Sequence, residues 1–183
     1  EGEGTPSAPY KITTENEWWY IVSKMNSVKE REHWLAASYV LENDLDLSEI
    51  SIQSAASGGT YYAFKGHLDG QYHTISGLTW SGNSSSNPKI SGLFAYVDAS
   101  GLVENLTVDG SLMRDSGTGG VALLAGNNAG TNTGTVISCR STGSITSSRG
   151  YAGGIVSAAI DGERCAEALA MQIKQSSSFD RSV

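Results

Sequence analysis

The sequence predicts an all-β fold, a short right-handed parallel β-helix, and three observations carry this prediction. Residues 101–112 match residues 134–145 position for position, and a third, partial copy begins at Gly153. A fixed period of this kind is typical of solenoids, in which each repeat buries its apolar side against the next. Valine, leucine and isoleucine come in short runs between glycine, asparagine and aspartate. With 22 glycines available for corners, such strands suit a turning β-helix.

The composition bounds the class of protein. The chain has 183 residues, which is enough for one substantial domain, and its net charge of −7 argues against nucleic acid and anionic membrane surfaces as partners. The sequence contains no run of about 18 apolar residues, so we expect no membrane insertion.

Three segments are expected along the chain. Residues 1–10 read as a linker, residues 11–160 as the β-solenoid domain, and residues 161–183 as a C-terminal helix and tail. The domain opens with a predicted helix over 12–25, in which Thr14 and Glu17 fit a capping box. Its apolar residues at spacings of three and four are Trp18, Ile21, Val22 and Met25. A helix this short is not stable alone, so we expect it to cap the open end of the solenoid.

Strand patterns follow. Residues 38–47 alternate apolar and polar positions, with Val40, Leu45 and Leu47 predicted to face the core. Residues 61–80 contain two strand pieces, interrupted at Lys65-Gly66 and Asp69-Gly70.

The end of the chain leaves alternatives open. Residues 162–174 predict a helix that either closes the second end of the solenoid or precedes a point where the sequence was cut. Cys139 stands where the earlier repeat has Leu106, which predicts a small buried hydrophobe. A disulfide between Cys139 and Cys165 is the alternative.

One segment carries a family resemblance. Residues 64–78, FKGHLDGQYHTISGL, resemble the start of bacterial surface solenoids, and the segments at 92–94, 120–123 and 154–156 resemble GLUG repeats. Such repeats occur in cell-surface adhesins and in the non-catalytic part of IgA-protease-like proteins. The resemblance implies a non-catalytic extracellular module of a larger multidomain protein, serving as a stalk or adhesive surface for a glycan or a host or cell-surface protein. Ala95, Ala125 and Ser157 depart from the pattern, where glycine is common.

The alternative function is a carbohydrate-active β-helix. Asp44, Asp46 and Asp69 would supply the paired carboxylates that glycoside hydrolysis needs, or a calcium site. We favour solvated outward positions and an Asp-Gly turn instead. His67 and His73 flank that turn, but no H-E-x-x-H motif is present, and the resembled pattern has a structural histidine at His73. We therefore predict no catalytic residue, no metal and no cofactor.

Aromatic side chains are the better indication of binding. They are spread over the first half of the chain, at Trp18, Trp19, Trp34, Tyr61, Tyr62, Tyr72, Trp80 and Tyr96. Such rings can form platforms for sugars, although half or more of them are expected to pack the capping helix. Tyr61, Tyr62 and Trp80 are the candidate binding residues, in a third reading of the chain as a glycan-binding module.

Overall fold

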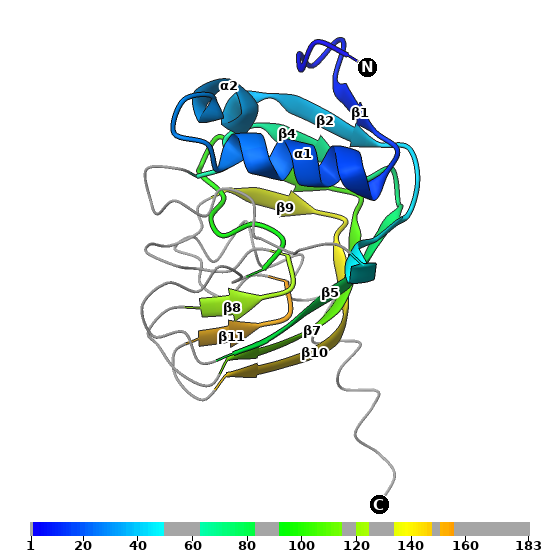
Figure 1. The fold of residues 1–183 in the computed structure, drawn as a ribbon, viewed down its shortest axis with the longest axis vertical. Helices are drawn as coiled ribbons and strands as arrows, with labels where there is room; N and C mark the ends of the chain where they lie inside the picture. The colour runs from blue at the N-terminus through cyan, green and yellow to red at the C-terminus, as the bar shows by residue number, and fades with distance from the viewer. Residues whose placement is uncertain are drawn as a thin grey trace, which may run out of the picture.

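The computed structural model describes residues 2–49, 63–82, 92–114, 120–124, 134–147 and 151–155 (Figure 1). Its elements, in chain order, are β1 (Tyr10–Ile12), α1 (Glu15–Met25), α2 (Arg31–Ala36), β2 (Ser38–Leu41), β3 (Leu45–Asp46), a 3-10 turn (Leu47–Glu49), β4 (His67–Asp69), β5 (Thr74–Gly82), β6 (Leu102–Glu104), β7 (Thr107–Arg114), β8 (Gly120–Ala122), β9 (Thr135–Ile137), β10 (Arg140–Ser147) and β11 (Tyr151–Gly153). The predicted C-terminal helix within 161–183 lies outside these residues.

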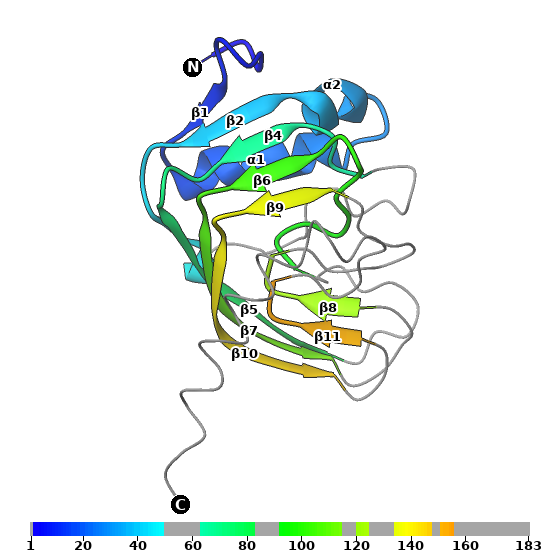
Figure 2. The same cartoon turned by 180° about the vertical axis from the view of Figure 1, so that it is seen from behind.

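The strands among the described residues form three parallel sheets. One has the order β1-β2-β4-β6-β9, a second the order β10-β7-β5-β3, and a two-stranded sheet pairs β11 with β8. In Figures 1 and 2 the strands within each of the two larger sheets lie one beside the next, and α1 and α2 lie near the first strands of the five-stranded sheet. The described fold is therefore mixed α/β.

The predicted all-β fold closed into a right-handed β-helix is wrong. The described residues form separate parallel sheets together with two helices, and they do not close into a solenoid. The repeat indicates that equivalent strands lie side by side, because identical positions recur at a fixed offset. It does not determine whether the sheets close into a solenoid.

The structure confirms that equivalent strands of the repeat pair in parallel. Strand β6 pairs with β9, and β7 pairs with β10, at a constant offset that places Leu112 beside Ile145. Cys139 is buried at the position equivalent to Leu106, as expected of a small hydrophobe, and it is a free thiol. Gly110 lies where β5 and β7 approach closely, since an added Cβ would come within 2.2 Å of the Leu78 carbonyl oxygen.

Helix α1 forms as its sequence predicts. The Thr14 side chain accepts a hydrogen bond from the Glu17 backbone, and the Glu17 side chain accepts one from the Thr14 backbone, which completes the capping box. The buried residues of the helix are Trp18, Ile21, Val22 and Met25, the predicted apolar face.

The core runs between the helix and the sheets. One column of buried side chains follows the register across the five-stranded sheet, through Tyr39, Leu68, Val103 and Val136. Stacked rings of Phe64 and Phe94, with centroids 4.7 Å apart, extend the core, and Trp18 meets Phe94 edge to face.

The predicted core face of residues 38–47 is correct for Leu45 and Leu47 and wrong for Val40. Leu45 and Leu47 are buried, whereas Val40 is half-buried between buried Tyr39 and Leu41. In β2 the buried residues Tyr39 and Leu41 flank Val40, and the same alternation continues to Leu45 and Leu47, so Val40 points to the opposite face. Among the residues that the structure describes, no helix has the length and apolar character needed to span a membrane.

Candidate functional site

The three aromatic residues singled out from the sequence do not define a site in the structure. Tyr61 and Tyr62 lie outside the described residues. The backbone of Trp80 belongs to β5 and pairs with Leu112, but its side chain is not among those described. Their role in binding stays a prediction.

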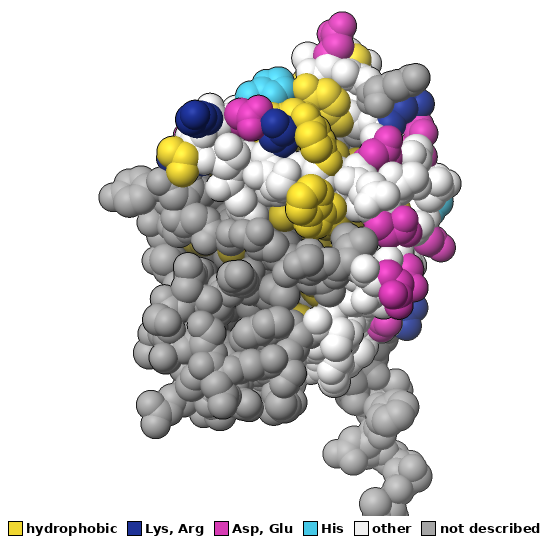
Figure 3. All heavy atoms as spheres, viewed as in Figure 1, with side chains coloured by type: hydrophobic (Ala, Val, Ile, Leu, Met, Phe, Trp, Pro, Cys, Tyr) yellow, Lys and Arg dark blue, Asp and Glu magenta, His cyan; other side chains and the backbone are white. Residues whose placement is uncertain are grey.

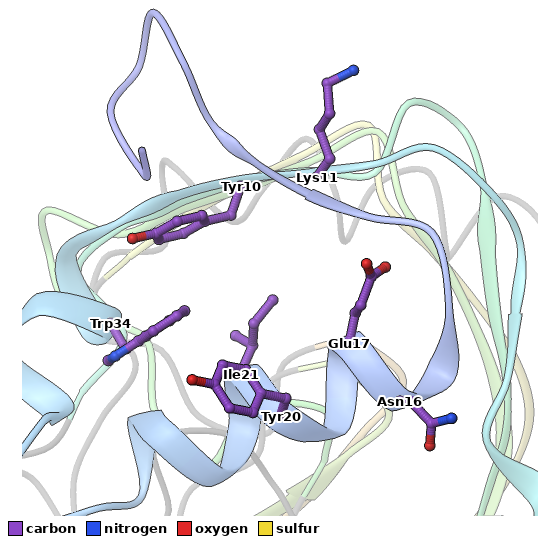
Figure 4. Close-up of a pocket in the computed structure, with 7 residues that line it drawn as sticks. All are labelled: Tyr10, Lys11, Asn16, Glu17, Tyr20, Ile21 and Trp34. Atoms are coloured by element: carbon purple, nitrogen blue, oxygen red, sulfur yellow. The ribbon is translucent and has the colours of Figure 1, made fainter. Parts of the chain in front are cut away.

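An aromatic pocket opens instead between β1, α1 and α2, as Figure 4 shows. Its cavity has a volume of about 300 Å³, at the lower end of the range for small-molecule sites. The lining residues are Tyr10, Lys11, Asn16, Glu17, Tyr20, Ile21 and Trp34. We call this feature the aromatic pocket.

Three rings give the aromatic pocket its shape. Tyr10 and Trp34 are stacked, with centroids 5.0 Å apart and planes inclined by 18°. Tyr20 stands almost perpendicular to Trp34, at 85° and 5.7 Å. Tyr10 and Trp34 therefore cover part of each other's faces, and the perpendicular Tyr20 adds a third ring to the lining of the cavity.

Contacts behind the rings fix their positions. The Tyr10 hydroxyl and His33 Nε2 are 2.8 Å apart in a hydrogen bond, and His33 also packs edge-on against Trp34. The Tyr39 hydroxyl donates to the Trp34 carbonyl oxygen, which holds the backbone of α2. Because Tyr39 is buried, desolvation raises the pKa of its phenol, which stays a neutral donor.

The charged residues of the pocket, Glu17 and Lys11, already form hydrogen bonds or ion pairs with other residues of the chain. Oε2 of Glu17 accepts hydrogen bonds from the Thr13 backbone and hydroxyl, each at 2.7 Å, and from the Thr14 backbone at 3.1 Å. The hydrogen bonds from Thr13 hold the pKa of Glu17 below its ordinary value, so its carboxylate is ionised at neutral pH. Lys11 forms an ion pair with Glu42, and Figure 4 shows its side chain directed away from the cavity.

The pocket lies on a face where hydrophobic side chains reach the surface. Figure 3 shows them grouped over the helical end of the molecule, with charged side chains around them. Tyr20 and Trp19 are each 49% exposed on α1, although Trp19 does not line the cavity. Two large rings are therefore exposed at neighbouring positions of α1.

Each of the three candidate carboxylates accepts a hydrogen bond from a backbone N–H group of the chain. Asp44 accepts from the Thr74 backbone at 2.8 Å and contacts His73 Nδ1 at 3.1 Å. Asp46 accepts from the backbone of Ser48. These hydrogen bonds, to Thr74 and to Ser48, lower the pKa values of the two carboxyl groups.

Asp69 lies at the end of β4, in a different sheet from Asp46. It accepts from the Gln71 backbone and from Asn105 Nδ2, each at 3.0 Å. His67 contacts Glu104 at 2.7 Å on the same sheet. In the described parts of the chain, no three His, Cys, Asp or Glu side chains lie together as a metal-binding group.

The fold and the pocket define a mixed α/β domain of parallel sheets with an aromatic cavity at its helical end. A scan against protein-family models matches none of them, so the GLUG assignment stays a prediction. The chain is 32% identical over 158 residues to Halomucin of Haloquadratum walsbyi, covering 79% of this chain and 2% of Halomucin. It therefore spans only a small part of that relative.

A solved structure resembles the fold. It is the crystal structure of a protein from Bacteroides ovatus that is provisionally assigned as an immunoglobulin A1 protease. The TM-score is 0.60 at 23% sequence identity, covering 88% of this chain and 46% of the other. This likeness shows a shared fold.

Sequence reasoning did not find the aromatic pocket. Trp34 was one of many aromatic residues, Tyr20 lay outside the apolar face of α1, and Tyr10 stood at the end of the expected linker. The structure places Tyr10 as the first residue of β1, paired with Tyr39. The available signal was the number of aromatic residues among the first 40, which predicts a cluster but does not say which rings meet.

Proposed function

We propose that this chain is a non-catalytic module of a surface or secreted protein and that it acts as an adhesive surface. The observation that carries the proposal is the aromatic pocket, a preformed and exposed cavity in which hydrogen bonds hold the Tyr10 hydroxyl and the backbone of Trp34. Preformed rings lose little conformational entropy on binding, which favours recognition of a ligand.

The comparisons support the same function. Halomucin has a name that denotes a mucin, and mucins are secreted or cell-surface proteins; one segment of it is 32% identical to this chain. The resemblance of the glycine-containing repeats to GLUG repeats of adhesins agrees with an extracellular location. Net charge of −7 fits a partner that is not nucleic acid.

The non-catalytic part of the proposal rests on the carboxylates. Asp44 and Asp69 bind backbone amides and neighbouring side chains; Asp44 lies between β2 and β3, and Asp69 is the last residue of β4. A glycosidase needs two carboxyl groups facing one bond, with one of them free to exchange a proton. Carboxylates that are engaged in turns favour a structural role.

The proposal is tested by binding of the purified chain to an immobilised mucin-type glycoprotein, measured by biolayer interferometry. We expect saturable binding that Tyr20→Ala weakens about tenfold, because one wall of the aromatic pocket is lost. Tyr72→Ala is the matched control, since Tyr72 is a 78% exposed tyrosine that does not line the pocket. Absence of binding by the unmodified chain, or equal loss in both variants, would contradict the proposal.

A further inference from the structure

We propose that the aromatic pocket binds a neutral pyranose ring, which packs against the rings of Tyr10, Trp34 and Tyr20 that line the cavity. This inference rests on the proposed function and names the ligand class of the same site. It follows from the size of the cavity, the arrangement of its rings and the charges that line it.

The size and the ring geometry come first. A cavity of about 300 Å³ holds one sugar ring with its substituents, and it is too small for a helix or a strand of a partner protein. A pyranose has a flat face of C–H groups and an edge of hydroxyls. The flat face needs only one aromatic surface, which the stacked Tyr10–Trp34 pair supplies where it lines the cavity, and Tyr20 stands perpendicular to Trp34 beside it.

The same geometry argues against a quaternary ammonium group, which aromatic cages also bind. A cage requires several ring faces directed at one point. Tyr10 and Trp34 stack on each other, so each ring covers part of a face of the other and fewer ring faces remain to surround a cation. The ring of Tyr20 already makes a cation–π contact with the Lys24 ammonium, whose Nζ lies 5.2 Å from the ring centroid.

The charges select a neutral ligand rich in hydroxyl groups. All three hydrogen bonds to the Glu17 carboxylate fall on Oε2, which leaves Oε1 as an acceptor for a ligand hydroxyl. The ionised carboxylate repels an acidic sugar. Lys11 does not offset this repulsion, because it points away from the cavity and pairs with Glu42.

The test follows the indole N–H signals of the four tryptophans by two-dimensional NMR during titration with single compounds. The probes are methyl glycosides of glucose, galactose, mannose and N-acetylglucosamine, with methyl glucuronoside and tetramethylammonium as competitors of different charge. We expect at least one neutral glycoside to shift the Trp34 signal with a Kd of about 1–10 mM, a range typical of a single small ligand with few contacts.

Two variants sharpen the result. Tyr20→Ala is expected to lower the affinity for the neutral glycoside about tenfold, whereas Tyr72→Ala is expected to leave this affinity unchanged. Glu17→Gln keeps the shape and an acceptor oxygen while removing the charge, and it is expected to raise the affinity for methyl glucuronoside relative to the neutral glycoside by several-fold. Tyr20 is half exposed, so its removal is compatible with folding and keeps the test valid if Glu17→Gln fails to fold.

Failure of this inference is distinguishable from failure of the proposed function. If the chain binds the immobilised glycoprotein equally well after its glycans are removed, the pocket recognises protein and the sugar assignment is overturned. A Trp34 shift with tetramethylammonium and with none of the glycosides overturns it in favour of a cation. Loss of glycoprotein binding on deglycosylation, with glycoside shifts at Trp34, supports it.

Discussion

Removal of the N-cap hydroxyl of α1 offers a quantitative test of how this helix is held. In Thr14→Ala the Glu17 backbone N–H loses the acceptor that it reaches at 3.3 Å. N-cap substitutions of this kind cost 0.5–2 kcal/mol, and about 1 kcal/mol is expected here because Thr14 is exposed and water replaces part of the bond. For a chain of this length the melting temperature should fall by about 2–4 °C.

Urea denaturation followed by circular dichroism measures the change in the free energy of unfolding. Thr14→Ser is the matched control, since it keeps a hydroxyl acceptor at the same position and should stay within about 0.3 kcal/mol of the unmodified chain. The reasoning is refuted if the alanine and serine variants lose equal stability, because the loss would then come from the methyl group rather than from the cap. Amide exchange should be faster in the first turn of α1 in the alanine variant alone.

Three further predictions concern the core and the charged turns. Phe94→Ala should lower the free energy of unfolding by about 3–5 kcal/mol in urea titrations, whereas exposed Trp19→Ala should change it little. Burial raises the pKa of the Cys139 thiol to about 11, so peptide mass spectrometry should find Cys139 unlabelled by iodoacetamide at pH 8 in the folded chain and labelled in guanidinium. The hydrogen bond from the Thr74 backbone holds the pKa of Asp44 below 3.8. The ionised carboxylate therefore stabilises the folded chain above pH 3.8, and this stabilisation is lost as the pH falls through the lower folded-state pKa. Asp44→Asn should reduce the loss of stability that the unmodified chain shows in acid, measured as the free energy of unfolding against pH.

Local and periodic features of the structure could be predicted from the sequence. The capping box depends on two residues three positions apart, and the buried face of α1 depends on a spacing of three and four. The strand register follows from the repeat, which also explains why Cys139 occupies a buried position equivalent to Leu106. Each of these depends on a relation between residues that the sequence displays directly.

Whether the sheets close into one solenoid could not be predicted in this way. A repeat of short strands is compatible with one closed solenoid and with separate parallel sheets, because both place equivalent strands in register. The short segments at 105–106 and 138–139 join strands of the two larger sheets and belong to the repeat itself. The repeat therefore marks these corners as equivalent, but it does not determine whether the sheets close. The contribution of α1 to the core was visible as an apolar face, but its effect on the fold class was not.

The aromatic pocket escaped prediction for a related reason. Tyr10, Tyr20 and Trp34 come from three different elements, and no spacing relates them. They meet only because Tyr10 in β1 pairs beside Tyr39, whose hydroxyl then holds the backbone of Trp34. A contact network that runs through a buried tyrosine and a backbone carbonyl leaves no pattern in the sequence.

Helix α1 contributes both to the core and to the proposed binding site. Trp18 and Val22 on one side are buried in the core, while Glu17 and Tyr20 on the other side line the aromatic pocket. Ile21 belongs to both, since it is buried and also lines the cavity. Glu17 also completes the capping box, and Tyr10 and Trp34 pack against the core, so changes at these residues would alter folding as well as the proposed binding. Tyr20 is half exposed, so a change at this residue of α1 would alter the proposed binding with little effect on the core.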